Sequence, residues 1–170
     1  LQADMLSTIT GFTRLRKRAA LSAVEGEANG LVVGSLRGAV AEVWRRGGAI
    51  AEGRQAYWVC PLVEQSEVLD FTSAEDRFQR LRAVLGEDQV GLVHGQMPAQ
   101  DKDAAMQRFQ SGQTRALVAT TVIEVGVDVP NATHMFIENA ERLGLAQLHQ
   151  LRGRVGRGHL ASRCVLLFKP

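Results

Sequence analysis

The sequence of 170 residues is short of several residue types and patterns, and each shortage argues against a class of protein. It has two cysteines, Cys60 and Cys164, both within apolar runs, so we expect buried, reduced thiols rather than a disulfide framework. Cysteine and histidine do not occur at zinc-ligand spacing, so we expect no metal site. No apolar run approaches the roughly 18–20 residues of a membrane-spanning helix, so we expect no membrane partner.

Lysine is also scarce, and its placement excludes a common nucleotide-binding motif. Lys17, Lys102 and Lys169 neither follow a glycine nor precede a serine or threonine. The motif G-x-x-x-x-G-K-[ST], whose backbone and lysine cradle phosphates, is therefore missing, and an acidic D-E-x-H box that could hold Mg²⁺ is missing too. We expect that this chain alone binds neither ATP nor Mg²⁺ in the usual way.

The remaining composition is that of an ordinary globular domain, with 45% apolar and 22% charged residues. The net charge of +2 is too small to indicate nucleic acid by itself. The charge is unevenly placed, however. Residues 56–141 carry six basic and thirteen acidic side chains, whereas residues 142–170 carry six basic and no acidic ones. The basic end is a candidate polyanion site, and an ordinary solvated helix face is the alternative.

Short apolar segments alternate with helical patterns along residues 46–170, which we expect to form the main domain. Strands are expected at 55–60, 90–94, 115–119, 133–138 and 164–168, and helices at 72–85, 98–109 and 145–154. The first helix is expected to begin at the capping box Thr72-Ser73-Ala74-Glu75. This order predicts an α/β fold with a parallel sheet, right-handed crossovers and helices on both faces.

Residues 1–45 show a weaker pattern and are expected to form a separate N-terminal segment. Residues 8–20 could form a short basic helix. Asn29-Gly30 is typical of a turn before the apolar residues that follow it.

Polar residues and glycines occur where several expected strands end. In chain order they are His94, Gly95, Thr120, Thr121, Glu124, Gly126 and Asp128. Ligands of parallel sheets bind at the carboxyl ends of the strands, so we expect these loops to converge on one edge. The threonines and His94 could contact a phosphate backbone, and Asp128 could accept a hydrogen bond from a ribose hydroxyl. Each residue alone could equally be an ordinary turn or strand-end residue.

The motif Gln150-x-x-Gly153-Arg154-x-Gly156-Arg157 is the most informative one. Two arginines three residues apart at a helix end can present planar guanidinium groups to phosphate oxygens, and the glycines let a polyanion approach. Such arginines could stabilise the negative charge of a phosphoryl-transfer transition state. For this motif alone, a generic basic loop is the alternative.

The segments that carry these motifs closely resemble the second motor domain of the RecG family of bacterial ATP-dependent DNA helicases, in superfamily two. The resemblance rests on VATTVIEVGVDVPNATHMFIENAERLGLAQLHQLRGRVGRG, EGRQAYWVCPLVEQSE and GLVHGQM, and it covers about residues 50–170. It implies a RecA-like fold, a bacterial cytoplasmic location and ATP-driven movement on DNA. It also implies a role in DNA repair and recombination through branched, fork or Holliday-junction DNA.

The resemblance implies nucleotide-site roles position by position. Arg154 and Arg157 match arginines that reach ATP bound by the first motor domain, and Gln150 leads that motif. Gly126 and Asp128 match a motif near the nucleotide. In the full enzyme ATP and Mg²⁺ are expected to bind mainly to the first motor domain, which this sequence lacks. We therefore expect a helicase fragment that is inactive alone.

The same resemblance implies DNA contacts at the strand ends. Thr120 and Thr121 match threonines that contact the DNA backbone, and Glu124 is expected to orient their motif. His94 and Gly95 match a motif that meets the phosphates of the tracked strand. Two alternatives stay open: the second motor domain of the transcription-repair coupling factor, and a non-catalytic RecA-like module that binds DNA or a partner protein.

Overall fold

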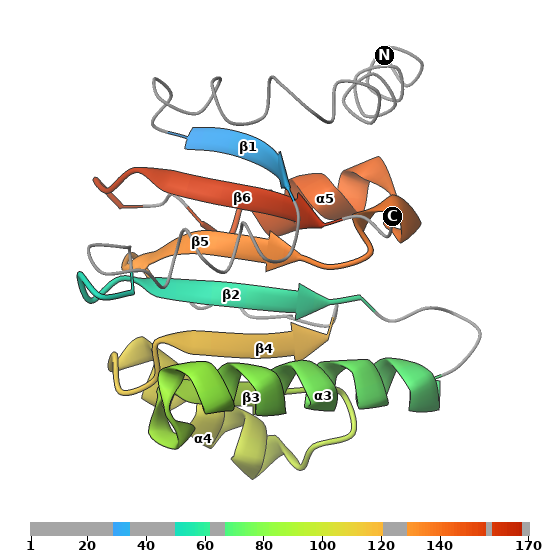
Figure 1. Ribbon diagram of the computed structural model, residues 1–170, viewed down its shortest axis with the longest axis vertical. Coiled ribbons are helices and arrows are strands. Elements are labelled where there is room, and N and C mark those ends of the chain that lie inside the picture. The colour runs from blue at the N-terminus through green and yellow to red at the C-terminus, as the bar shows by residue number, and fades with distance from the viewer. Residues whose placement is uncertain (1–28, 35–49, 62–66, 121–128, 156–157, 168–170) are drawn as a thin grey trace.

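The computed structural model describes residues 29–34, 50–61, 67–120, 129–155 and 158–167, and these form one sheet covered by helices (Figure 1). Its strands are β1 (Asn29–Gly34), β2 (Gln55–Cys60), β3 (Val90–Val93), β4 (Ala116–Thr120), β5 (Ala132–Ile137) and β6 (Ser162–Leu167). They lie in the order β1-β6-β5-β2-β4-β3, and every neighbouring pair is parallel. The predicted parallel α/β architecture is therefore confirmed.

Within the described residues, three helices cover the two faces of this sheet. They are α3 (Glu67–Leu85), α4 (Ala99–Gln110) and α5 (Leu145–Arg152), with short 3₁₀ turns η1 (Glu87–Gln89) and η2 (Ala140–Arg142). Figure 1 shows α3 in front of the sheet and α5 behind it. Helix α4 packs on the same face as α5, because Met106, Phe109 and Leu151 belong to one core cluster.

The helix boundaries agree with the sequence where a proline or glycine marks them. Helix α4 follows Pro98, and Gly112 just after its end has φ +79°, a conformation that glycine adopts readily. Helix α3 begins at Glu67, so the prediction that it starts at the capping box beginning with Thr72 is wrong. Residues 67–71 contain no glycine or proline, so nothing in them stops the helix from extending toward its N-terminus.

Strand β1 was not predicted. Asn29 and Gly30 open this strand, which pairs with β6 in a register that places Asn29 beside Ser162, so the expected turn at these two residues is wrong. A turn propensity is local, whereas the partner strand lies at the other end of the sequence. The expected helix at 8–20 lies outside the described residues, and the boundary between residues 45 and 46 stays a prediction.

The central strand β2 is buried on both faces, which explains the apolar run that follows Gln55 in it. Tyr57 and Val59 belong to the cluster under α4 and α5, and Ala56, Trp58 and Cys60 belong to the cluster under α3. This alternation follows from the two-residue period of a strand. Strand β2 therefore joins the two layers of the core.

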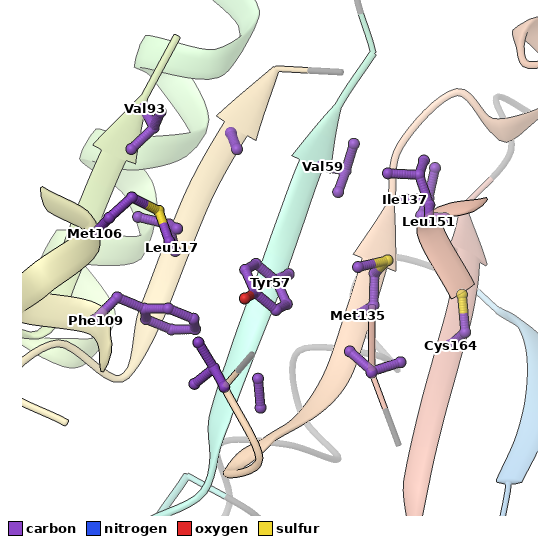
Figure 2. Close-up of a cluster of buried hydrophobic side chains, with 14 of the residues drawn as sticks. Tyr57, Val59, Val93, Met106, Phe109, Leu117, Met135, Ile137, Leu151 and Cys164 are labelled. Atoms are coloured by element: carbon purple, nitrogen blue, oxygen red, sulfur yellow. The ribbon is translucent and has the colours of Figure 1, made fainter. Parts of the chain in front are cut away.

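The cluster under α4 and α5 fixes these two helices to the sheet. Figure 2 shows Met106 and Phe109 of α4, and Leu151 of α5, against side chains from the strands. The ring of Phe109 is fully buried and lies 4.9 Å from that of Tyr57, centroid to centroid, at an interplanar angle of 57°. Burying one phenylalanine stabilises a fold by roughly 1.5–3 kcal/mol.

Both cysteines are buried and free, as predicted. Burial raises the pKa of the Cys60 thiol, with a further rise from the nearby Glu138 carboxylate. Burial also raises the pKa of Cys164, to about 12. Both thiols are therefore protonated at neutral pH and behave as small core side chains.

Candidate functional site

His94 and Thr120 lie at the carboxyl ends of the neighbouring strands β3 and β4. The register pairs Val93 with Ala119. His94 directly follows Val93, and Thr120 directly follows Ala119. Thr120 is 2% exposed, and its Oγ1 has no hydrogen-bond partner among the residues that the structure describes. A buried hydroxyl left without a partner destabilises a fold by about 1–3 kcal/mol. The expected convergence on one edge is met by these two residues.

The loop after β3 is held by a lysine that the sequence analysis did not single out. The Lys102 ammonium, in the first turn of α4, donates a hydrogen bond to the Gly95 carbonyl oxygen at 3.0 Å. Burial lowers the pKa of His94; Lys102 lowers it further, whereas Glu75 opposes the shift. His94 is therefore neutral at pH 7, and Lys102 supplies the positive charge beside it.

Helix α5 places Gln150 and Arg154 away from the core. Leu151 and Val155 are buried in the cluster under α4 and α5, at 8% and 9% exposure. Gln150 is exposed and Arg154 is half-buried, and the Arg154 amide donates to the Leu151 carbonyl at 3.0 Å. The helical turn therefore fixes the backbone of Arg154 through its apolar neighbours.

Gly158, in the loop that follows α5, lies near the amino end of β5 rather than at the carboxyl edge of the sheet. A β-carbon built on Gly158 would lie 3.0 Å from the carbonyl oxygen of Pro130, which comes just before β5. This end of the arginine-bearing loop is thus near the amino end of β5, and the expected convergence of all loops on one edge is not observed here. The loop lies instead beside the segment that follows Asp128.

Several predicted site residues cannot be placed in this arrangement. Thr121, Glu124, Gly126, Asp128 and Arg157 lie outside the described residues, and their roles stay predictions.

The described site has the donor groups that bind phosphate oxygens. Near the carboxyl ends of β3 and β4 these groups are the Lys102 ammonium, the Thr120 hydroxyl and the neutral His94 ring. The Arg154 guanidinium lies apart from them, after the end of α5. In the part of the chain that the structure describes, no three His, Cys, Asp or Glu side chains group so as to hold a metal ion. None of the described helices has the length and apolar character needed to cross a bilayer. The site therefore suits a phosphate-bearing ligand.

Comparison with known proteins agrees with this chemistry. Residues 46–159 match the family of the helicase conserved C-terminal domain. The chain belongs to this family. The ATP-dependent DNA helicase RecG of Escherichia coli K12 is 64% identical over 120 residues, which are 71% of this chain and 17% of that protein. RecG of Acidithiobacillus ferridurans is 62% identical over 118 residues, 69% of this chain and 17% of that protein.

A solved structure extends the likeness of this helicase C-terminal domain to three dimensions. RecG bound to a three-way DNA junction superposes with a TM-score of 0.65 at 41% identity, covering 85% of this chain and 18% of that one. The RecA-like fold and the resemblance to RecG are thus confirmed. The helicase C-terminal domain spans less than a fifth of the length of these relatives.

Sequence reasoning gave Lys102 no place in the candidate site, and it named Gly158 only as a glycine that lets a polyanion approach, not for its contact with Pro130. Lys102 stands four residues after Pro98, where a helix was expected, so its place in the first turn of that helix could have been noted. The close contact of Gly158 with Pro130 leaves no local signal, because it joins segments from two motifs.

Proposed function

We propose that this chain works as the second motor domain of an ATP-dependent DNA helicase of the RecG type. The observation that carries the proposal is the 41% identity, over 85% of the chain, to RecG bound to a three-way DNA junction. The complete enzyme would act on branched, fork or Holliday-junction DNA in the bacterial cytoplasm. The first motor domain of the same enzyme would be the direct partner of this chain.

DNA would be held at the carboxyl edge of β3 and β4. Thr120 and Thr121 would donate hydroxyl hydrogen bonds to backbone phosphates, with Glu124 orienting their loop. Neutral His94 would donate one further hydrogen bond beside Gly95, and Lys102 would add charge. Contacts of this kind position a nucleic acid without reading its sequence, which suits an enzyme that moves along DNA.

ATP would be bound mainly by the first motor domain together with Mg²⁺, and this chain would complete that site. When bound, ATP supplies the phosphoryl group whose transfer to water drives movement. Arg154 and Arg157 would place guanidinium groups against its phosphates, where negative charge builds up in the transition state. Gln150 would orient this loop, and the segment holding Gly126 and Asp128 would lie beside it. Among the described residues, the Arg154 guanidinium supports this role, because its planar donors match phosphate oxygens.

The experiment that tests this proposal compares the chain alone with the complete helicase that contains it. ATP turnover is measured with and without a three-way DNA junction. We expect DNA-stimulated turnover from the complete protein and none above background from the chain alone. A complete protein that binds the junction without hydrolysing ATP would contradict the proposal and favour the non-catalytic module. Sustained turnover by the chain alone would contradict the shared nucleotide site.

A further inference from the structure

A buried cluster of three polar contacts joins β5 to β2 and α3 at the carboxyl edge of the sheet. Glu138, the first residue after β5, accepts a hydrogen bond at Oε1 from the indole N–H of Trp58 at 2.7 Å. The same oxygen accepts the Arg77 Nε–H of α3 in an ion pair. The Arg77 guanidinium also lies over the Trp58 ring, 5.3 Å from its centroid. One carboxylate therefore connects three elements.

The surroundings of this cluster make its geometry hard to change. Trp58 is fully buried and stacks on Phe136, with ring centroids 4.7 Å apart. The Arg77 and Glu138 side chains are only 14% and 17% exposed. Removing one member of such a pair leaves the other charge poorly compensated in a low-dielectric site, so the pair strongly favours one arrangement.

The backbone next to Glu138 turns from one face of the sheet to the other. The Glu138 amide donates to the Val59 carbonyl at 2.9 Å, and Asn139 has φ +48°, in the left-handed region. Ala140 is 2% exposed in the cluster under α4 and α5, and Leu143 packs against that cluster. The turn is thus held on the α3 face by the Glu138 side chain and on the opposite face by Ala140 and Leu143.

We infer that Glu138 is a positioning residue that sets where α5 leaves the sheet, and therefore where Arg154 meets the nucleotide. This inference rests on the proposed function. Helix α5 has eight residues and starts soon after the turn, so a shift at Glu138 is carried along it to Arg154. Arg77 of α3 shares this role, because the same carboxylate oxygen holds both sides of the pair. In enzymes, a displacement of about 1 Å in a reacting group can lower the rate about 10²-fold.

The test measures ATP hydrolysis by the complete helicase with saturating three-way DNA junction. We expect Glu138→Gln to lower kcat at least about tenfold and to change KM for ATP less than about threefold, because it acts on the transition-state arginine rather than on ground-state binding. Arg77→Gln should have the same effect, and the double variant should be no worse than either single one, because all three break one pair.

Glu87→Gln is the matched control. Glu87 also pairs with an arginine of α3, Arg82, at 3.7 Å, but the Glu87 side chain is 84% exposed. The kcat of the Glu87→Gln helicase should therefore match that of the wild type. Thermal unfolding of each variant shows whether it is folded at the assay temperature, and Arg77→Gln carries the test if Glu138→Gln does not fold.

A folded Glu138→Gln or Arg77→Gln protein with kcat within about twofold of the wild type would overturn the inference. Losses that simply add in the double variant would overturn it too, because they would show two independent effects. Failure of the proposed function has a different signature, since the wild-type helicase itself would then lack DNA-stimulated turnover.

Discussion

Gly158 approaches Pro130 so closely that a β-carbon at position 158 would lie 3.0 Å from the Pro130 carbonyl oxygen. Val129 and Val155, which precede these residues, are both buried in the cluster under α4 and α5. The end of the arginine-bearing loop is therefore packed against the segment after Asp128. The residues that follow the two predicted nucleotide-binding motifs are thus neighbours in the fold, although β5 and α5 separate them in the sequence.

Substituting Gly158 should disturb this contact. Gly158→Ala forces the Pro130 carbonyl to move by a few tenths of an ångström, and we expect it to destabilise the chain by about 1–3 kcal/mol. Thermal or urea unfolding measures this change. Gly144→Ala is the control, because its β-carbon would meet only the flexible Gln147 side chain, at 3.9 Å. Equal stabilities for the two variants would show that the contact is not tight.

Thr120→Val should separate a DNA-binding hydroxyl from a structural one. The change keeps the side-chain shape and removes a buried hydroxyl that has no partner among the described residues, so stability should not fall and should rise by up to about 1–3 kcal/mol. Affinity of the complete helicase for DNA should decrease with little dependence on sequence. Thr114→Val is the matched control, because Thr114 has a similarly buried hydroxyl near the amino end of β4. Unchanged DNA affinity in Thr120→Val would show that the Thr120 hydroxyl does not bind DNA and that Thr120 is an ordinary strand-end residue.

Lys102→Gln should weaken DNA binding through charge. It removes the ammonium beside the Gly95 carbonyl, so the slope of log affinity against log salt should become shallower by about one unit. Arg108→Gln, at an exposed position in the last turn of α4, tests whether any cation on this helix matters equally. The same salt dependence in the wild type and Lys102→Gln would argue that Lys102 only holds the loop.

Stability should fall in mild acid because of a buried histidine. Burial, and then the charge of Arg54, lower the pKa of His134 from 6.5 to about 4. Between these values the unfolded chain binds the proton and the folded chain does not. This contribution is thus fully present above the unfolded pKa and is lost as pH falls, by up to about 3 kcal/mol.

Urea unfolding between about pH 4 and pH 7 measures this slope. His134→Gln should remove most of it, and His159→Gln, at an exposed position, should leave it in place. If His134→Gln keeps the full slope, other groups account for the acid sensitivity.

The sequence predicted the parts of the fold that depend on local pattern. Strand β2 was recognisable because burial on both faces requires an apolar run, and α4 because Pro98 and Gly112 flank it. Strand β1 was missed because its register with β6 joins residues far apart in the chain. The start of α3 was placed too late because a capping-box sequence inside a helix looks the same as one at the N-terminus of a helix.

The placement of His94 and Thr120 at neighbouring strand ends was predictable because each lies at the end of an apolar strand pattern, and their roles stay predictions. The supports of the site were not predictable. Trp58, Arg77 and Glu138 come from three elements, and no spacing in the sequence indicates that one carboxylate oxygen meets both of its partners. Such contacts depend on how the sheet brings β2 and β5 together and on where α3 crosses them.

In the proposed function, this chain supplies arginines to a nucleotide site that it shares with another motor domain. The most direct measurement is kcat for ATP hydrolysis by the complete helicase carrying Arg154→Ala, with saturating three-way DNA junction. Arg157→Ala should behave alike, and Arg80→Ala, at an exposed position of α3, is the control. We expect a loss of roughly 10³-fold for Arg154→Ala with the fold intact. A loss below about tenfold, no greater than that of the control, would contradict it.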